Sequence, residues 1–439
     1  MSESTIDTDT TTEEGHFSSY AEVMAYLGKL GLFHMELDLG RIRTVLDELE
    51  LTRPEYPVVQ VVGTNGKGST ATFIASIATG SGLNTGLFTS PHFVTPRERV
   101  LVDGEMLPEE DWLLLANDIM AAGGETLTYF EFITVLAALA FADYEVELAV
   151  FEAGLGGTYD ATTAIAADTV VFTSIDMDHE NILGDTIEKI AADKAGAIRK
   201  HVPVVTTAQQ AAVRTILDEA CAAQSTRAFT AEDLVTLPEE AVPALHGPHQ
   251  RRNATLALAA LQTIMDEKAI PRPTLIPWTD VVTLGIADAW IAGRMQLIEK
   301  TENHPALILD GGHNLHGLTT LKEALVASGT RPAAIVFAAM KDKSLNGVGK
   351  LLAEMTDGPI LLPALTGNER AALPAELAVL LKPDFADAAM LRPCASVQDA
   401  LQQAQQIEPQ GDDSPPVLMC GSLFLLAEFF TLHPEYLKK

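Results

Sequence analysis

The sequence predicts an α/β fold in which parallel sheets are covered by helices on both faces. Short runs rich in β-branched residues, each of strand length, alternate along the chain with longer segments rich in Ala and Leu. Continuous apolar strands between helices are typical of parallel sheets that are buried on both faces. The alternation pauses near Gly293 and then restarts, so the 439 residues are expected to form more than one domain.

The first part of the chain contains clear strand and helix candidates. The strand candidates are Val58–Val62, Leu148–Phe151 and Val170–Ser174, and each is dominated by apolar residues. The segments between them include Ala71–Thr79 and Ile133–Ala142, whose length and Ala/Leu content predict helices. This part is therefore expected to form parallel strands joined by helices.

The second part of the chain repeats this pattern. Its strand candidates are Ala306–Leu309, Ala334–Ala338, Ile360–Leu362 and Val417–Met419, and a predicted helix at Asn253–Asp266 lies between the two sets. We expect residues 16–293 to form the first domain and residues 294–439 the second. Residues 1–15 are expected to form a disordered acidic tail, because their low hydrophobicity and negative charge give them no reason to pack.

The composition excludes several classes of function. The chain carries 60 acidic and 29 basic residues, a formal net charge of −31, whereas binding nucleic acid needs a basic face. The three cysteines are far apart, which excludes a disulfide framework and a zinc ribbon. No signal peptide is evident, and no apolar run approaches the ~20 residues that span a bilayer. We therefore expect a cytoplasmic protein with neither a nucleic-acid nor a membrane partner.

Acidic and imidazole side chains follow the predicted strands. Glu152 ends the second strand candidate, Asp178 and His179 follow the third, and Asp310 ends the first strand candidate of the second domain. Ligands of open parallel sheets collect at the carboxyl ends of the strands, so these side chains are candidates for a site. The alternative is that they are ordinary loop residues or helix caps.

A glycine-rich loop directly follows Val58–Val62 and precedes a helix-forming segment. It consists of Gly63, Thr64, Asn65, Gly66, Lys67, Gly68 and Ser69. Glycines let backbone N–H groups converge on phosphates, a lysine neutralises charge, and the helix N-terminus adds its dipole. The loop is therefore predicted to bind nucleotide phosphates, and the alternative is a turn without a ligand. With this loop included, we predict a P-loop parallel-sheet ATPase domain followed by a smaller Rossmann-like α/β domain.

The loop departs from the usual phosphate-binding pattern. Two residues separate its first two glycines where about four are usual, and Gly68 follows Lys67 where a hydroxyl residue is usual. Because the hydroxyl is displaced to Ser69, we expect other residues to help ligate a metal ion.

A set of further motifs runs through the chain in a fixed order. They are Leu87-Phe-Thr-Ser-Pro-His92, Arg97-Glu-Arg99, Thr128-Tyr-Phe-Glu131, Glu152-Ala-Gly-Leu-Gly-Gly157, Asp178-His179, Asp193-Lys-Ala-Gly196, His249-Gln250, Asn253-Ala254, Gly293-Arg-Met-Gln296 and Asp310-Gly-Gly-His-Asn314. With the glycine-rich loop, they resemble the folylpolyglutamate synthase/dihydrofolate synthase family of the Mur ligase superfamily. The resemblance covers nearly the whole chain, and it identifies the first domain as one of the Mur ligase central type.

The resemblance implies an ATP-dependent amide ligase that acts through an acyl phosphate. The implied substrates are ATP, L-glutamate, and either dihydropteroate or a reduced folate, and the implied cofactor is Mg²⁺. A phosphorylated carboxylate is a good acyl donor, so the protein mainly positions and neutralises anions. We expect a monomer.

The resemblance also implies metal ligands and a modified lysine. Ser90, Glu152 and His179 match the metal ligands of the family, and Lys194 matches a lysine that carbon dioxide carbamylates. Alternatively, Ser90 caps a turn, His179 satisfies a loop carbonyl and Lys194 is a solvated lysine on a helix surface. Carbamylation requires the free amine, so neighbours must lower the pKa of Lys194.

Both domains are implied to contact ATP. Asn253 matches a residue on the adenine side, and Arg294 and Asp310 match residues of the hinge and the second domain. His313 follows Asp310 closely and is expected to act in catalysis with Lys67 and Lys194. If these groups touch one nucleotide, the domains must close around it and exclude water. The family usually has alanine where this chain has Gly312, which removes no functional group.

The implied pterin-binding residues are Leu127, Tyr159, Asp160 and Ala161. Tyr159 offers a stacking face, and the carboxylate of Asp160 is expected to accept hydrogen bonds from pterin amino groups. Aromatic residues at such spacing are more often part of a core.

Two other interpretations remain open from the sequence. One is another Mur-superfamily ATP-dependent amino-acid ligase, which would share the phosphate loop and Lys194. The other is a nucleotide-binding regulator without catalysis. The regulator is disfavoured by the joint presence of Lys67, Glu152, His179, Lys194 and Asp310.

Overall fold

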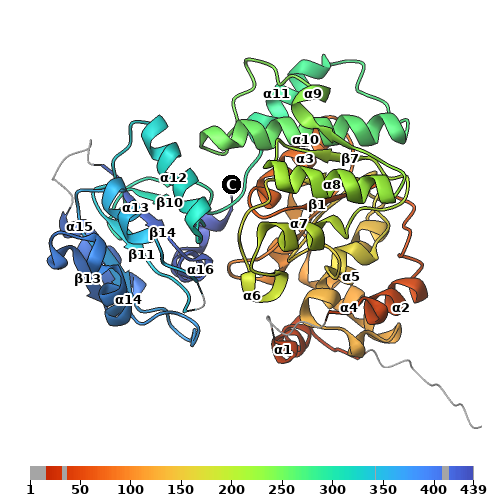
Figure 1. Cartoon of the computed structure of the whole chain (residues 1–439). Helices are drawn as coiled ribbons and strands as arrows, with labels where there is room; N and C mark the ends of the chain where they lie inside the picture. Colours follow the sequence, from red (N-terminus) through yellow and green to blue (C-terminus); the bar gives the residue numbers. More distant parts are fainter. Residues whose placement is uncertain (1–15, 32–36, 342, 408–414, 439) are drawn as a thin grey trace, which may run out of the picture.

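The computed structural model describes residues 16–31, 37–341, 343–407 and 415–438. Its strands form two sheets, which lie in two lobes side by side (Figure 1). The elements from α1 to α11 build the first lobe, and those from β9 onward, coloured teal to blue, belong to the second. The acidic tail expected at residues 1–15 lies outside the described residues.

The first sheet has eight strands in the order β4-β3-β2-β5-β1-β6-β7-β8. The strands are β1 (Val58–Val62), β2 (Thr85–Phe88), β3 (Val100–Val102), β4 (Glu105–Met106), β5 (Leu148–Glu152), β6 (Thr169–Phe172), β7 (Val204–Thr206) and β8 (Ala228–Thr230). All neighbours from β2 to β8 pair in parallel, whereas β3 is antiparallel to both β2 and β4. The carboxyl ends of β1, β5 and β6 therefore meet at one edge.

Helices cover both faces of the first sheet (Figure 1). One face packs against α1 (Tyr20–Leu30), α2 (Gly40–Glu48), α4 (Glu109–Ala121), α5 (Tyr129–Asp143), α7 (Ile187–Ala195) and α8 (Ala211–Ala223). The other packs against α3 (Lys67–Gly80), α9 (Ala231–Leu234), α10 (Pro248–Glu267) and α11 (Trp278–Asp288). Within β1, Val58 and Val62 point to the first face and Val59 and Val61 to the second. Burial on both faces explains why β1 is continuously apolar.

The second sheet has six strands in the order β13-β12-β11-β14-β10-β9. They are β9 (Gln296–Ile298), β10 (Leu307–Leu309), β11 (Ile335–Phe337), β12 (Ile360–Pro363), β13 (Leu391–Cys394) and β14 (Val417–Cys420). Only the β9–β10 pair is antiparallel among the pairs of this sheet in the described part of the chain. The result is a smaller parallel sheet with one antiparallel edge strand.

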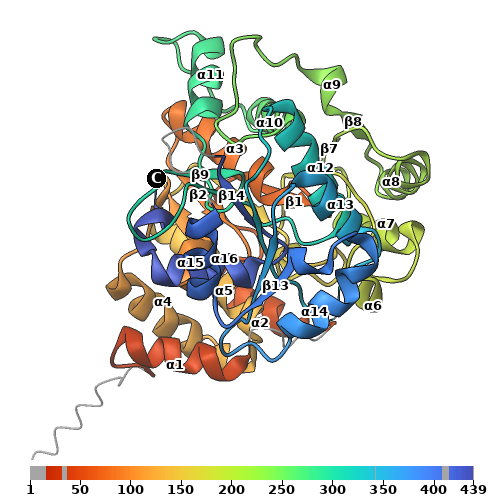
Figure 2. The ribbon, with the colours of Figure 1, turned by 90° about the vertical axis from the view of Figure 1, so that its left-hand side faces the viewer.

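The helices of the second lobe also form two layers (Figure 2). One layer consists of α12 (Leu315–Ala327), α13 (Val348–Met355) and α14 (Pro374–Leu381), and the other of α15 (Val397–Ile407) and α16 (Leu423–Leu432). The remaining short helices are α6 (Glu180–Leu183), η1 (Pro96–Arg99), η2 (Gly124–Thr126), η3 (Ala161–Ala164), η4 (Lys382–Asp384), η5 (Ala388–Met390) and η6 (Pro434–Leu437).

The predicted fold class is confirmed: a parallel-sheet P-loop domain precedes a smaller α/β domain. The predicted strands are present with end shifts of one or two residues, and the helix expected at Ala71–Thr79 begins earlier, at Lys67. Short strands such as β7 and β8 were not predicted, because three residues leave too little pattern to read. In the part of the chain that the structure describes, no helix is long and apolar enough to cross a membrane.

Candidate active site

The phosphate loop leads into the N-terminus of α3, and its glycines and backbone hydrogen bonds define its conformation. Gly66 is the N-cap of α3 in a left-handed conformation (φ 89°), which glycine adopts without strain. A Cβ atom at Gly63 would lie 1.9 Å from the Thr173 hydroxyl oxygen, so only glycine fits there. The N–H groups of Thr64 and Asn65 donate to the carbonyl of Ser174 at 2.9 and 3.3 Å. The first backbone N–H groups of α3, at the helix N-terminus, are therefore available to bind an anion.

Residues of α10 lie directly against this loop. Asn253 approaches Gly66 so closely that a Cβ atom there would be 2.7 Å from the side-chain oxygen of Asn253. Its amide nitrogen donates to Gln250 at 3.0 Å, and buried Gln250 donates to the Ser69 hydroxyl at 3.3 Å. This chain of side chains fixes Asn253 and Ser69 relative to each other, and it places the predicted nucleotide residue Asn253 beside the loop.

Glu152 and Ser90 are in direct contact. The backbone N–H of Ser90 donates to a carboxylate oxygen of Glu152 at 3.0 Å, and Glu152, the last residue of β5, is 5% exposed. Burial raises the pKa of Glu152, whereas the nearby charge of Lys67, the Ser90 N–H and the charges of Arg294 and Arg99 oppose the rise. The carboxylate therefore lies among cations at the mouth of the phosphate loop.

His179 and Glu152 both interact electrostatically with Lys67. It adopts a left-handed conformation (φ 52°), which is uncommon for a residue other than glycine. Burial, opposed by Asp178, lowers the pKa of His179 to about 4, and Lys67 is among the cations that lower it further. The imidazole is therefore neutral at physiological pH, as a metal ligand must be.

The chemistry of these donors fits a hard divalent cation. Glu152 offers a carboxylate and Ser90 a hydroxyl, the oxygen types that such cations prefer, and His179 adds a neutral imidazole. Within the described ranges, no three His, Cys, Asp or Glu side chains form a group that could hold a metal. The predicted metal ligands are a different kind of group, because they combine only two such side chains, Glu152 and His179, with the hydroxyl of Ser90.

Lys194 is buried below the phosphate loop. It lies on α7, is 4% exposed, and donates from Nζ to the carbonyl of Gly63 at 2.8 Å. Burial, and then the charge of Lys67, lower the pKa of Lys194 to about 7. The alternative of a solvated surface lysine is therefore wrong, and a large fraction of free amine is present at neutral pH.

The second lobe contributes Arg294 and Asp310 to this region. Asp310, which follows β10, accepts hydrogen bonds from the N–H groups of Gly312 (2.8 Å) and Met295 (3.0 Å). Burial raises the pKa of Asp310 and the charge of Arg294 opposes the rise. A Cβ atom at Gly311 would lie 2.2 Å from a guanidinium nitrogen of Arg294, so glycine makes this approach possible.

His313 has a defined proton arrangement. Its Nδ1 lies 2.9 Å from the carbonyl oxygen of Gly311, and a carbonyl only accepts, so Nδ1 carries the hydrogen. Nε2 is thereby left to accept a proton and lies 4.0 Å from a carboxylate oxygen of Asp178. The structure thus brings His313 to the loop that follows β6.

Asp178 joins the two lobes. Lys343 and Asn314, both from the second lobe, donate to its two oxygens at 2.8 and 3.0 Å. Although burial alone would raise it, the pKa of Asp178 is held well below its usual range by His179, which is charged at the acid pH where Asp178 titrates, and by the ammonium group of Lys343. Asp178 and Asn314 belong to the motifs named above, which gave these two residues no specific role. Lys343 lies outside all of those motifs, so the sequence provided no reason to expect it here.

The expected pterin-binding residues lie in two segments, Leu127 before α5 and Tyr159, Asp160 and Ala161 after β5, and they differ in exposure. Tyr159 is 50% exposed, whereas Leu127, Asp160 and Ala161 are buried. The carboxylate of Asp160 accepts from its own loop, from the N–H of Leu155 at 2.8 Å and of Thr162 at 3.0 Å. In this structure Asp160 therefore shapes the loop, and its contact with substrate stays a prediction.

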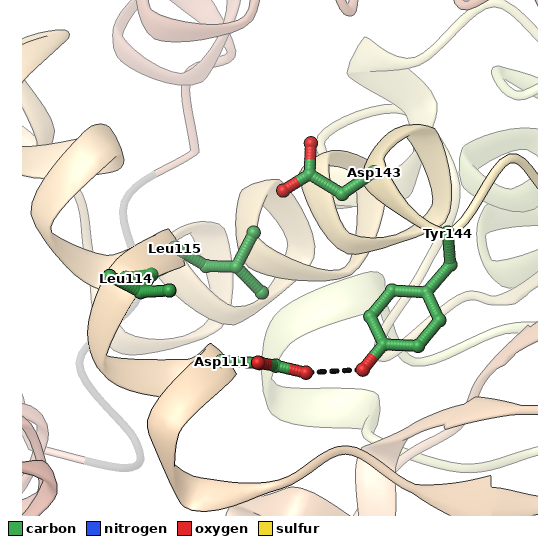
Figure 3. A pocket seen from close by; sticks show the side chains of 5 residues that line it. All are labelled: Asp111, Leu114, Leu115, Asp143 and Tyr144. Carbon is green, nitrogen blue, oxygen red and sulfur yellow. Dashed lines mark hydrogen bonds between the residues drawn. The ribbon is translucent and has the colours of Figure 1, made fainter.

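A cavity of about 270 Å³ lies elsewhere, between α4 and α5 (Figure 3). It is lined by Asp111, Leu114, Leu115, Asp143 and Tyr144, and the Tyr144 hydroxyl donates to Asp111. Tyr144 is the C-cap of the 15-residue helix α5, at the end opposite Tyr129, which lies beside Arg99. At ~1.5 Å per residue the helix separates its two ends by roughly 20 Å, so the cavity is remote from the phosphate loop.

Comparisons with known proteins agree with this geometry. The Mur ligase middle domain matches residues 61–232, and the glutamate ligase domain of the Mur ligases matches residues 293–423. The dihydrofolate synthase/folylpolyglutamate synthase of Bacillus subtilis (strain 168) is 33% identical over 366 residues, covering 76% of this chain and 83% of that relative. Its counterpart in Haemophilus influenzae is 31% identical over 449 residues, covering 94% and 98%.

Solved structures extend the likeness to three dimensions. The bifunctional folylpolyglutamate synthase/dihydrofolate synthase from Yersinia pestis, complexed with AMPPNP and a Mn ion, matches with a TM-score of 0.80 and 28% identity. The match covers 96% of this chain and 99% of that chain. The resemblance predicted from the motifs is confirmed: the chain belongs to the folylpolyglutamate synthase/dihydrofolate synthase family of the Mur ligases.

Proposed function

We propose that the chain is an ATP-dependent ligase that adds L-glutamate to the carboxylate of a folate or of dihydropteroate through an acyl phosphate. The observation that carries this proposal is the group of charged side chains at the phosphate loop. Buried Glu152 interacts electrostatically with Lys67 and with Arg294, and buried Lys194 donates to the carbonyl of Gly63. The family membership favours this function over another amino-acid ligation in the superfamily.

The residues divide the reaction between them. The amides of the phosphate loop and Lys67 hold the phosphates while a carboxylate oxygen of the acid attacks the γ-phosphorus and ADP leaves. The amine of glutamate then attacks the acyl carbon, and inorganic phosphate leaves as the amide bond forms. Arg294 and Lys67 neutralise the charge that gathers on the transferred phosphoryl group.

A divalent cation fits beside the phosphates. Glu152, Ser90 and His179 would hold it, and the bound ion would supply further neutralisation of the phosphate oxygens. A Mn ion accompanies AMPPNP in the Yersinia pestis relative. For this chain we propose Mg²⁺, because two oxygen donors leave room for the waters that this ion retains.

We further propose that Lys194 is carbamylated and that His313 acts in catalysis. The free amine of Lys194 would form a bond from Nζ to the carbon of carbon dioxide and lose one proton, giving an anion with carboxylate geometry. The pKa of about 7 makes that amine available. His313, with its hydrogen on Nδ1, keeps Nε2 free to accept a proton beside the reacting groups.

The finer assignments rest on the sequence and the family. We propose that Asn253, Arg294 and Asp310 contact ATP, that Leu127, Tyr159, Asp160 and Ala161 contact the pterin-bearing acid, and that the domains are residues 16–293 and 294–439. We also propose a monomer that works in the cytoplasm on small-molecule substrates.

A substrate panel tests the function. Phosphate release is measured with ATP, glutamate and either dihydropteroate or a reduced folate. In the control reactions, one of the three substrates is left out at a time. Release that requires all three substrates supports the proposal, and the two acids show which activity dominates. The proposal would be refuted if phosphate were released only with a uridine-linked muramoyl substrate. It would also be refuted if none of the acceptors gave phosphate release.

A further inference from the structure

The second lobe touches the phosphate loop itself through one side chain that the sequence did not single out. The side-chain nitrogen of Asn65, in the middle of the loop, lies 2.8 Å from Nδ1 of His316. His316 lies in the first turn of α12, on the second lobe. The hydrogen bond therefore joins the loop proposed to bind ATP to the other domain.

The roles of donor and acceptor in this contact are fixed. The amide nitrogen of Asn65 only donates, so Nδ1 of His316 accepts and the hydrogen of the neutral imidazole sits on Nε2. Nε2 lies 3.8 Å from a carboxylate oxygen of Asp176, on the loop that follows β6. His316 therefore bridges two segments of the first lobe, with an acceptor toward Asn65 and a donor toward Asp176.

The surroundings hold both partners in place. The backbone of Asn65 is fixed by Ser174, which accepts from its N–H at 3.3 Å and donates from its hydroxyl to the Asn65 carbonyl at 3.2 Å. On the other side, Asn314 caps α12 by accepting from the N–H of Gly317 at 2.7 Å and donates to Asp178 at 3.0 Å. His316 thus orients the side chain of a loop residue whose backbone is already set.

We propose that His316 is a positioning residue supplied to the phosphate loop by the second domain. It holds the side chain of Asn65 in one orientation on the phosphate loop only while the two lobes adopt this arrangement. Nucleotide affinity is thereby coupled to the position of the domain that carries Arg294 and Asp310. This inference rests on the proposed function of the loop.

The test compares His316→Ala, which removes the acceptor, with His316→Asn, whose side-chain oxygen can occupy the position of Nδ1. Steady-state kinetics are measured in ATP and separately in the acid, together with ADP binding by calorimetry. His316→Ala is expected to raise the KM for ATP and the Kd for ADP by roughly 5- to 10-fold, the loss of about one hydrogen bond, with the KM for the acid unchanged. His316→Asn is expected to stay within about 2- to 3-fold of the wild type.

A matched control is His246→Ala, which removes an exposed histidine of the first lobe. Equal ADP affinity in wild type, His316→Ala and the control would overturn the proposal, as would equal losses in His316→Ala and His316→Asn. If His316→Ala fails to fold by thermal melting, His316→Leu against His316→Asn makes the same comparison at similar volume. A wild type that binds no ADP contradicts the proposed function instead, so the two failures are distinguishable.

Discussion

The carboxyl edge of the first sheet and the cavity between α4 and α5 both bring ionisable side chains together, but these side chains differ in type and in burial. At the sheet edge, half-buried Lys67 and buried Glu152 and Lys194 come from separate elements. Burial, and then the charge of Lys67, lower the pKa of Lys194 to about 7. In the cavity, the Tyr144 hydroxyl donates to Asp111, and this hydrogen bond raises the pKa of Tyr144 to about 12.

The difference teaches that open space and reactive chemistry are separate properties. The cavity is lined by residues of two neighbouring helices and by Tyr144, whose hydroxyl stays protonated near neutral pH (Figure 3). The sheet edge holds an amine and an imidazole that are substantially uncharged at neutral pH. We infer that buried charges gathered from distant elements mark the active site better than cavity volume does.

The strongest test of this comparison is Lys67→Ala. Removal of the cation that faces Glu152 and the phosphate loop is expected to lower kcat/KM for ATP by about 10²- to 10³-fold, because the phosphoryl charge loses its nearest neutralising group. Steady-state phosphate release checks this, with the thermal midpoint as the control for folding. Wild-type turnover in a folded variant would remove the phosphate role of Lys67.

Lys194→Ala is expected to have the next largest effect. Loss of the proposed carbamate should reduce turnover by roughly 10- to 100-fold, with partial recovery in formate or acetate, which restore a carboxylate in the space left. The matched control is Lys189→Ala, an exposed lysine of the same helix, which should behave as wild type. Full activity of Lys194→Ala without added carboxylate would contradict the carbamate.

The pH dependence should follow the same lysine. Because its pKa is about 7 in the folded chain and about 10.4 in an unfolded one, the amine loses its proton near neutral pH only when folded. At fixed dissolved carbon dioxide, activity should rise by roughly 5- to 10-fold from about pH 6 to about pH 8.

The same shift has a defined sign for stability. Between about pH 7 and about pH 10 the unfolded chain binds the extra proton, so the contribution of Lys194 to the free energy of unfolding increases with pH in that window. Lys194→Met should flatten both profiles, measured by phosphate release and by urea unfolding. Unchanged profiles in Lys194→Met would assign the titration to another group.

The smallest effect is expected at the cavity. Tyr144→Phe removes the hydrogen bond to Asp111 and should lower the free energy of unfolding by about 1 kcal/mol, with kcat and both KM values unchanged. Urea unfolding and steady-state kinetics measure the two quantities. A loss of turnover in a stable Tyr144→Phe variant would show that the cavity takes part in function and would break the comparison.

Local patterns explain how much of the fold could be predicted. β1 is apolar on both faces, and the glycine-rich loop that begins at Gly63 follows it directly, so strand, loop and helix could all be inferred from neighbouring residues. β7 and β8 have three residues each and carry no pattern of their own. Their place in the sheet is set by the pairing of β7 with β6 and of β8 with β7, which a linear sequence does not display.

The site residues that lie in sequence motifs could be predicted. The contacts that form only between segments distant in the sequence could not. Glu152 could be placed at a strand end, but its hydrogen bond from Ser90 depends on β2 and β5 being neighbours. Lys343 and His316 reach the first lobe only because the domains pack against each other. The depressed pKa of Lys194 likewise comes from burial beneath a loop that lies far away in the sequence.

The most direct test of the central claim follows one oxygen atom. The acid substrate is prepared with heavy oxygen in its carboxylate, and the inorganic phosphate released during turnover with ATP and glutamate is analysed by mass spectrometry. If the carboxylate attacks the γ-phosphorus at the loop of Lys67, each amide bond formed leaves a heavy oxygen in one phosphate. Unlabelled phosphate accompanied by normal amide formation would contradict the acyl phosphate and, with it, the assignment of the buried sheet edge as the reaction centre.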